Sequence, residues 1–245
     1  FVYESISKES PVPVKKIPHG VELNISNGID RNYFGLPEKT FLFLSMYDIH
    51  SFQERKNPIA VINAFKKAFS PYNKSVALVV KVNNGGSNPK ELESLKKKVK
   101  GMNVYLINRT LSRKEINGLL NVCDSYVSLH KSEGFGLPLA EAMYLGKPVI
   151  GTNWSANTDF MTKDNSCLIN YRLKQIGINY GPYKSDQFWA EPSIIQASSF
   201  MKKLVQNKDW REIVAMKGKQ TINEYFSPIT VGRMVKSRLL ELELL

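Results

Sequence analysis

The sequence of 245 residues is poor in the residues that cross-link proteins or hold metals. It has two cysteines, Cys123 and Cys167, and three histidines, His19, His50 and His130. The cysteines are isolated, without the paired spacing of a disulfide framework or a zinc site, and the histidines form no local cluster. We therefore expect the cysteines to be small core residues in a reducing compartment, and we expect no metal site and no cofactor.

The sequence also has no long hydrophobic run. No apolar stretch approaches the roughly 18 residues of a membrane span, and no basic-then-apolar stretch opens the chain. These absences favour a cytoplasmic protein. Hydrophobic residues make up 42% and charged residues 23% of the sequence, which is ample for a full core. Because the chain starts at Phe1 and not at a methionine, we expect it to be a fragment of a longer protein.

Positive charge exceeds negative charge, with a formal net charge of +12. Such a balance favours anionic partners, namely phosphorylated small molecules, anionic lipid surfaces or nucleic acid. The basic runs at 96–100 and 201–203 lie on segments with helix spacing, so they are typical of a solvated helix face. No basic strand interleaved with aromatic residues is present, so we expect no nucleic acid partner. The charge is compatible with a peripheral position at the inner face of a membrane.

From residue 40 onward, strand patterns and helix patterns alternate. We expect strands at 40–46, 75–82, 103–107, 124–129, 147–151 and 166–170. We expect helices at 57–69, 89–99, 112–121 and 137–145. Strands that are apolar on both faces and alternate with helices predict a parallel sheet covered on both sides. With right-handed crossovers, this is an α/β fold with a doubly wound, Rossmann-like sheet.

The two ends of the chain differ from this alternating middle. Residues 1–38 contain prolines at 11, 13 and 18 and predict an extended connector, so the domain itself is expected at 39–245. Residues 171–192, rich in Tyr, Gly and Pro, predict a long loop over one edge of the sheet. Helix spacing at 192–206, 208–225 and 228–245 predicts three C-terminal helices.

The most informative stretch lies between an expected strand and an expected helix. Gly134 and Gly136 let the backbone approach a ligand closely, and Pro138 suits the first turn of a helix. The free N–H groups of a helix start attract phosphate. Glu133 and Glu141 stand on either side of this turn, and carboxylates can accept hydrogen bonds from both hydroxyls of a diol. Phosphate-binding backbone between two carboxylates is the chemistry that a sugar nucleotide needs.

The run from Glu133 through Glu141 resembles the E-x7-E motif of the group 1 family of retaining nucleotide-sugar glycosyltransferases. Residues 41–69, the turn at 109–112 and residues 146–150 are also similar to the family, and 14–23 resembles its hinge strand. The resemblance implies a GT-B architecture, in which two Rossmann-like domains face a cleft and the C-terminal domain binds most of the donor. This chain would be that C-terminal half, and residues 1–38 the hinge from a missing N-terminal domain.

The resemblance also implies roles for the residues of the motif. Glu133 would contact hydroxyls of the donor sugar near its reacting carbon, and Glu141 the ribose hydroxyls. The backbone that would hold the sugar or the diphosphate belongs to Gly134, Phe135, Gly136 and Leu137.

Two further segments match the family outside the motif. Arg55 and Lys56 match a basic pair that neutralises the leaving diphosphate, although exposed charges at a helix start would look the same. Arg109, Thr110 and Leu111 lie where the family cradles the base, and a plain turn explains them almost as well. His130 is expected to be a strand-end residue near the donor. Residues 154–159 would line the sugar pocket or form a helix N-cap.

The sequence departs from the family at Met46, where many members carry an arginine after the first strand. Arg55 could compensate for the missing charge, or the donor phosphates could be held differently.

The resemblance implies a retaining, metal-independent transfer of a hexosyl group from a nucleoside diphosphate to a glycan or lipid-linked acceptor, in polysaccharide or lipopolysaccharide biosynthesis. Without the first domain, we expect the chain to bind nucleotide weakly and to lack transferase activity. A nucleotide-sugar epimerase or phosphorylase of the same fold, or a non-catalytic nucleotide- or nucleic-acid-binding module, remains an alternative.

Overall fold

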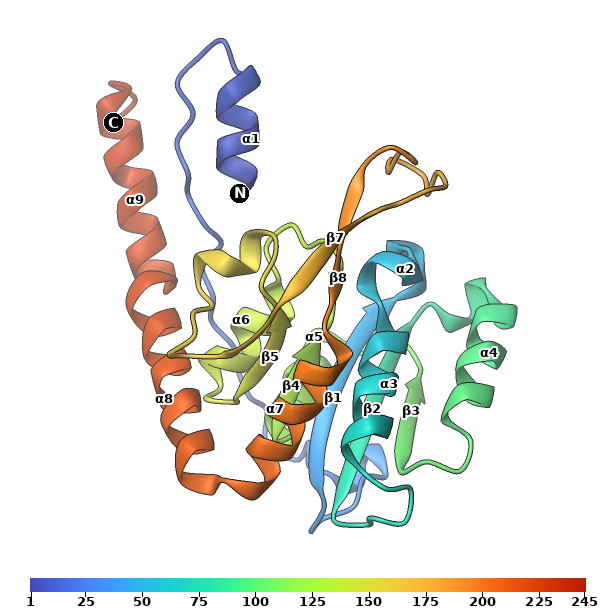
Figure 1. Ribbon diagram of the computed structural model, residues 1–245. Coiled ribbons are helices and arrows are strands. Elements are labelled where there is room, and N and C mark those ends of the chain that lie inside the picture. Colours follow the sequence, from blue (N-terminus) through green and yellow to red (C-terminus); the bar gives the residue numbers. More distant parts are fainter.

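The computed structural model describes residues 1–245 and contains a six-stranded parallel sheet with helices on both faces (Figure 1). The strand order is β3-β2-β1-β4-β5-β6. The strands are β1 (Phe41–Asp48), β2 (Val76–Asn83), β3 (Val104–Asn108), β4 (Ser125–Ser128), β5 (Val149–Thr152) and β6 (Cys167–Ile169). This order is that of a doubly wound Rossmann-like sheet, so the predicted fold class is confirmed.

Nine α-helices accompany the sheet, and α4 and α8 have the bounds that the sequence predicts. The helices are α1 (Val2–Glu9), α2 (Gln53–Lys56), α3 (Pro58–Ala68), α4 (Pro89–Val99), α5 (Arg113–Val122), α6 (Leu137–Tyr144), α7 (Ile194–Gln206), α8 (Lys208–Tyr225) and α9 (Pro228–Glu241). The last three are the predicted C-terminal helices. No helix in the structure combines the length and apolar character that crossing a membrane requires.

The sheet is buried on both faces, and β1 illustrates how. Leu42 and Leu44 join the cluster formed with α5, α6 and α8, whereas Phe43 joins the cluster formed with α3 and α7. Successive side chains of a strand point to opposite faces, so a strand apolar at every position needs cover on both sides. Cys123 and Cys167 are core residues as expected, and burial raises the pKa of both thiols to about 12.

Local capping signals fix the ends of the helices next to the site. The side chain of Ser112 accepts from the N–H of Glu115, and the Glu115 carboxylate accepts from the N–H of Ser112, so the predicted capping box is present. Gly146 has φ +69° and follows α6, where a left-handed residue ends a helix. The sequence therefore determines where α5 begins and where α6 ends.

Residues 171–192 differ from the prediction. They form an antiparallel hairpin of β7 (Tyr171–Gln175) and β8 (Phe188–Pro192), separate from the main sheet, so the prediction of a long loop is wrong. The Gly-, Tyr- and Pro-rich composition belongs to the tip of the hairpin at 176–187. The apolar–polar alternation of β7 extends only from Tyr171 to Lys174, and residues 172–175 are exposed, so the strand has a short sequence signal and no buried face.

The segment before residue 39 contributes to the body of the domain. Residues 14–23 are extended without being a strand, and Val21, Leu23 and Leu36 are buried in the core. The expected connector also contains the helix α1, which lies beyond the carboxyl ends of the strands (Figure 1). The boundary at residue 38 stays a prediction, but part of the preceding chain is structurally inseparable from the domain.

The Arg31 side chain ties this preceding segment to the sheet. Its guanidinium lies 2.8 Å from Asp124, whose carboxylate also accepts from the N–H of Leu42 at 2.7 Å. The same guanidinium donates to the carbonyl oxygens of Pro37, Glu38, Thr40 and Val122.

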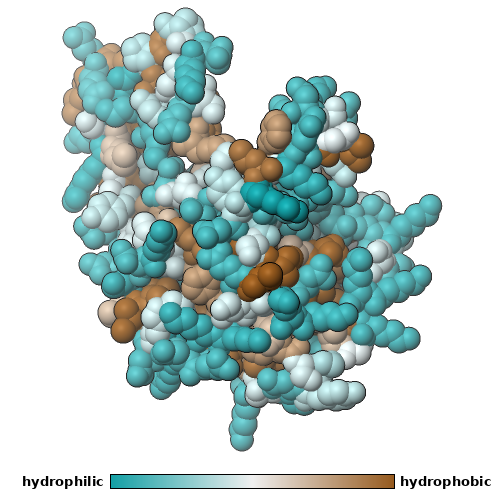
Figure 2. Space-filling model, in the orientation of Figure 1, coloured by the Kyte–Doolittle hydropathy of each residue, from teal (hydrophilic) through white to brown (hydrophobic).

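The surface is hollowed between two projections. Figure 2 shows one projection above α8, where α1 and α9 lie in Figure 1, and a second formed by the hairpin. Between them lies the edge of the sheet where the strands end.

Replacing Arg31 by methionine should lower the free energy of unfolding by roughly 2–3 kcal/mol, because charged hydrogen bonds would be lost and several carbonyls left unpaired. Urea unfolding measures this change. Arg233→Met, at an exposed arginine of α9, is the control and should be neutral within about 0.5 kcal/mol. Equal stability of both variants would show that the connector does not depend on this contact.

Candidate functional site

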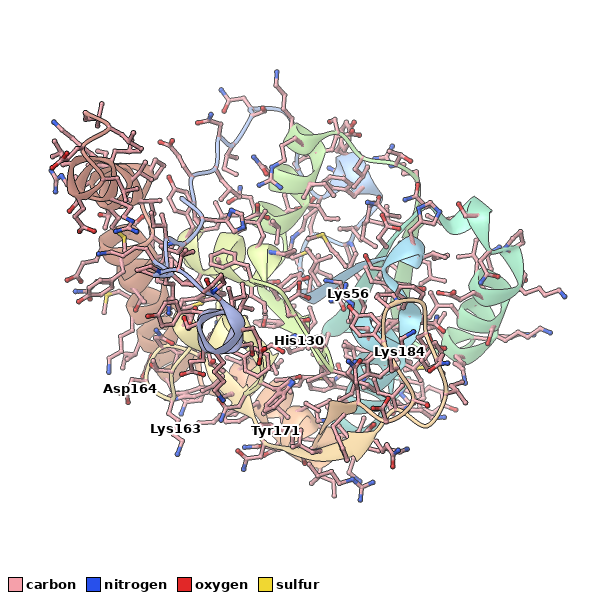
Figure 3. The ribbon with its side chains drawn as sticks, turned by 90° about the horizontal axis from the view of Figure 1, so that it is seen from above. Lys56, His130, Lys163, Asp164, Tyr171 and Lys184 are labelled. Atoms are coloured by element: carbon pink, nitrogen blue, oxygen red, sulfur yellow. The ribbon has the colours of Figure 1, made fainter.

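The candidate site lies at the carboxyl ends of β1 and β4. The chain runs outward from β1 through β2 to β3 and then returns to β4 on the other side of β1, so the strand order reverses between these two strands. Ligands of open α/β sheets bind in the crevice outside such a reversal point. Lys56, which follows β1, and His130, which follows β4, lie near the centre of the molecule when it is viewed from this end (Figure 3).

The turn after β4 presents unpaired backbone donors. Gly136 has φ +89° and forms the N-cap of α6, where a Cβ atom would stand 3.0 Å from Leu139 Cδ1 and 3.3 Å from Asn157 Cβ. A residue with a side chain would be strained there and crowded. The N–H groups of residues 134–137 donate to no protein acceptor. The predicted glycine turn therefore has the form of an anion-binding helix start.

The structure brings three predicted site residues together at this turn. Lys56 Nζ lies 2.5 Å from Glu133 Oε2, and Arg55 Nη1 lies 3.8 Å from the same oxygen. Arg55 Nη1 also donates to the carbonyl oxygen of Ser132 at 2.9 Å. All three charged side chains are less than one-fifth exposed, so their attraction is less screened than that of a surface pair.

A strained loop holds Arg55 and Lys56 in position. The short helix α2 is flanked by Phe52, with φ +59°, and Asn57, with φ +53°. Asn57 is one of the few residues that tolerate this conformation, and its amide donates to the carbonyl of Leu129 at 2.9 Å. This bond fixes the loop after β1 to the end of β4.

The hairpin β7–β8 covers the same loop. Its tip, which carries Lys184, lies over α2 (Figures 1 and 3). Phe52 meets the ring of Tyr183 edge to face at 5.9 Å, and a Cβ at Gly181 would lie 2.5 Å from the Phe52 ring. The hairpin, which the sequence predicted as a loop, therefore packs against the loop that carries Arg55 and Lys56.

A cavity of about 280 Å³ opens beside the turn, between the ends of β1 and β2 and the starts of α5 and α6. Glu141 is almost fully buried here and forms an ion pair with Arg113. Burial raises the pKa of Glu141, and the Arg113 guanidinium opposes this shift. The charged residues that line the cavity are Asp48, Lys56, Lys81, Arg113 and Glu141.

The turn at 109–111 does not line this cavity. Arg109 is exposed, 3.8 Å from Glu115, with its guanidinium over the ring of Tyr33 at 5.3 Å. Leu111 is a core residue. The structure thus groups Glu133, Lys56 and Arg55 with the glycine turn, and leaves Arg109, Thr110 and Leu111 apart. A role for the latter in holding a base stays a prediction.

Sequence reasoning missed two of the three cations that line the cavity. Arg113 follows the cap Ser112 and reaches Glu141 across the start of α6, a contact between segments that no local pattern reveals. Lys81 is the single charge in the Val-rich run 76–82, and a lone lysine inside an expected buried strand was a signal that could have identified it.

His130 is fully buried beneath the site, at the end of β4. Its Nδ1 lies 3.0 Å from Ser128 Oγ, and its Nε2 lies 3.0 Å from Asn157 Oδ1 and 3.2 Å from the carbonyl oxygen of Trp154. Two acceptors around Nε2 require the proton on that nitrogen. Burial lowers the pKa of His130, although the nearby Glu133 opposes the shift, so the ring is neutral. This arrangement fits a positioning role rather than that of a base.

The region after β5, predicted to line a sugar pocket or cap a helix, forms a 3-10 helix at Ala156–Asp159. Its Asn157 is buried beneath Gly136. No three His, Cys, Asp or Glu side chains of the structure come together in a way that could hold a metal ion.

The comparisons with known proteins identify a family and several solved structures with a similar fold. The model of the family "Glycosyl transferases group 1" matches residues 28–170. The fold is similar to sucrose-phosphate synthase from Thermosynechococcus elongatus, with a TM-score of 0.72, 15% identity, and coverage of 98% of this chain and 56% of that one. No curated protein matches the sequence.

Two other solved structures are similar to the chain. One is HepE from Anabaena in complex with UDP and glucose, with a TM-score of 0.65, 15% identity, and coverage of 89% of this chain and 56% of that one. The other is the C-terminal domain of LpcC, a group 1 family protein from Francisella tularensis, with a TM-score of 0.60, 18% identity, and coverage of 83% and 95%. The chain therefore spans about half the length of HepE and of the synthase.

The buried His130 should make stability depend on pH. The unfolded chain protonates this histidine near pH 6.5, whereas the folded state keeps it neutral. Stability should therefore be undiminished above that pH and fall below it, with a slope approaching about 1.4 kcal/mol per pH unit.

Urea unfolding of the wild type and of His130→Gln between pH 7.5 and 5 measures how much His130 contributes to the pH dependence of the free energy of unfolding. The variant should lose less stability on acidification than the wild type, and His50→Gln, at an exposed histidine, should follow the wild type. Parallel curves for all three proteins would contradict a neutral, buried His130.

Proposed function

The chain belongs to the group 1 glycosyltransferases, and from this membership we propose that it binds a nucleoside-diphosphate sugar at the carboxyl ends of β1 and β4. The observation that carries the proposal is the turn at 134–137, whose free N–H groups lie between two carboxylates that each have a cationic partner. Backbone donors at a helix start bind phosphate, and the carboxylates accept hydrogen bonds from hydroxyls. The likeness to HepE, solved with UDP and glucose, supports this ligand class.

Lys56 and Arg55 neutralise the diphosphate as it leaves. In the structure, Lys56 is paired with Glu133. A bound diphosphate competes for the ammonium group of Lys56, which releases Glu133 to accept hydrogen bonds from the donor sugar. Fixed cations in a partly buried site stabilise the developing negative charge without reorganisation. We assign this role to these side chains rather than to a metal ion.

Glu141 anchors the ribose. Its carboxylate lies inside the cavity on the far side of the glycine turn, where Arg113 keeps it oriented. A carboxylate takes both hydroxyls of a vicinal diol, and its near-complete burial makes such bonds stronger than they would be in water.

The reaction is the transfer of a hexosyl group to a glycan or lipid-linked acceptor with retention of the anomeric configuration. The acceptor attacks on the face from which the diphosphate leaves, so no covalent nucleophile is required. A net charge of +12 supports an anionic or lipid-linked acceptor, such as those of polysaccharide and lipopolysaccharide biosynthesis.

The acceptor wall of the cleft belongs to a second domain of the complete protein. This chain spans 95% of the isolated C-terminal domain of LpcC but about half of the longer relatives, which supports its assignment as the donor-binding half. Residues 1–245 alone should therefore bind donor without transferring sugar to any acceptor. Robust transfer by this chain would contradict the assignment.

Calorimetry with UDP, GDP, ADP and dTDP sugars tests the proposed ligand directly. One nucleotide class should bind, and Glu141→Gln should weaken it roughly tenfold or more, because a charged hydrogen bond to the ribose is lost. Inorganic pyrophosphate, which has no ribose, should bind the variant and the wild type alike. Glu93→Gln, at an exposed residue of α4, is the matched control. If no nucleotide sugar binds the wild type, the proposed function is wrong.

If side chains neutralise the diphosphate, a chelator of divalent metal ions should not change the affinity for the donor. Donor affinity should stay within about twofold when magnesium is replaced by EDTA. Lys56→Met should reduce affinity for the nucleoside diphosphate by roughly tenfold in both buffers. Binding that requires the divalent ion would assign the neutralising role to a metal.

A further inference from the structure

Lys81 is a charged residue in the middle of an apolar strand. Its side chain is among the largest fully buried ones, with 1% exposure, and the other residues of β2 from Val76 to Val82 are aliphatic. In the parallel register of the sheet, Lys81 is the partner of Met46 on β1. Both residues line the cavity beside the glycine turn. The ammonium group of Lys81 therefore lies at the end of the sheet next to the site.

Lys81 is also the one cation of this cavity without a carboxylate partner. Lys56 is paired with Glu133 and Arg113 with Glu141, but no carboxylate oxygen lies within 4.0 Å of Lys81 Nζ. Its hydrogen-bond acceptor is the side-chain oxygen of Asn83. Burial lowers the pKa of Lys81, and the more distant Asp48 opposes that shift.

An unpaired buried cation is costly for the folded protein. Removing a charge from water is unfavourable unless an opposite charge compensates for it, and a neutral amide compensates only in part. An aliphatic residue at this position would avoid the cost and would continue the pattern of the strand. An anion bound in the cavity would supply the missing compensation.

We propose that Lys81 binds the diphosphate of the donor, supplying from β2 the positive charge that Met46 cannot supply from β1. This inference rests on the proposed function, because it takes the donor to be a nucleoside diphosphate. It takes up the second alternative that the sequence left open at Met46, that the donor phosphates are held differently. Arg55 donates to the carbonyl oxygens of Ser51 and Ser132 and lies beside Glu133, whereas the only partner of Lys81 is the neutral side-chain oxygen of Asn83.

The test compares Lys81→Met with the wild type in the full protein. Ligands are the nucleoside diphosphate that binds the wild type, inorganic pyrophosphate and the free nucleoside. The variant should bind the nucleoside diphosphate and pyrophosphate at least tenfold more weakly, and the nucleoside unchanged. Its melting temperature without ligand should equal or exceed that of the wild type, because a buried unpaired charge is removed. Lys66→Met, at an exposed lysine of α3, is the control.

Each other outcome is informative. If the wild type binds no nucleoside diphosphate, the proposed function fails before Lys81 is tested. If the wild type binds it and Lys81→Met binds it as tightly, the function stands and the role of Lys81 is wrong. Lys81→Gln is the second variant, in case methionine disturbs the strand. Loss of folding in both variants would mean that the charge serves the fold, and this would overturn the proposal.

Discussion

The need to compensate buried charge at the ends of β1 and β4 governs the structure around the site. Cations and carboxylates from four separate segments meet there, the carboxylates with little access to water, and a buried charge needs a partner. Without ligand, Lys56 neutralises Glu133 and Arg113 neutralises Glu141. Under the proposed function, ligand binding in such a site is an exchange of partners, in which a diphosphate replaces the carboxylate beside Lys56 and the released carboxylate accepts hydrogen bonds from sugar hydroxyls.

The segments around these charges include strained backbone. Phe52 and Asn57, which flank α2, have a positive φ that residues with side chains rarely adopt, and the hairpin tip packs over Phe52. On the other strand, His130 and Asn157 connect the end of β4 to the segment after β5. Strained backbone persists only where the surroundings over-determine it. These contacts join the loop after β1 to the hairpin and the end of β4 to the segment after β5.

Sequence alone predicted the sheet and the glycine turn before α6, because their signals are local. Strands such as Val76–Asn83 are apolar throughout, and the glycine turn carries its own helix start. The hairpin was not predicted because most of β7 is exposed and its strand signal is short. The positions of Arg113 and Lys81 in the cavity were not predicted, for another reason. Which side chains share a cavity depends on the register of neighbouring strands, and the pairing of Lys81 with Met46 can be seen only in the folded sheet.

A crystal structure of the protein with a bound nucleotide sugar tests this account most directly. The account predicts that the diphosphate lies over the turn at 134–137, that Lys56 has turned from Glu133 to a phosphate oxygen, and that the two glutamates contact hydroxyls. A ligand bound elsewhere, with both ion pairs intact and both acids directed away from it, would contradict the exchange of partners on which the account depends.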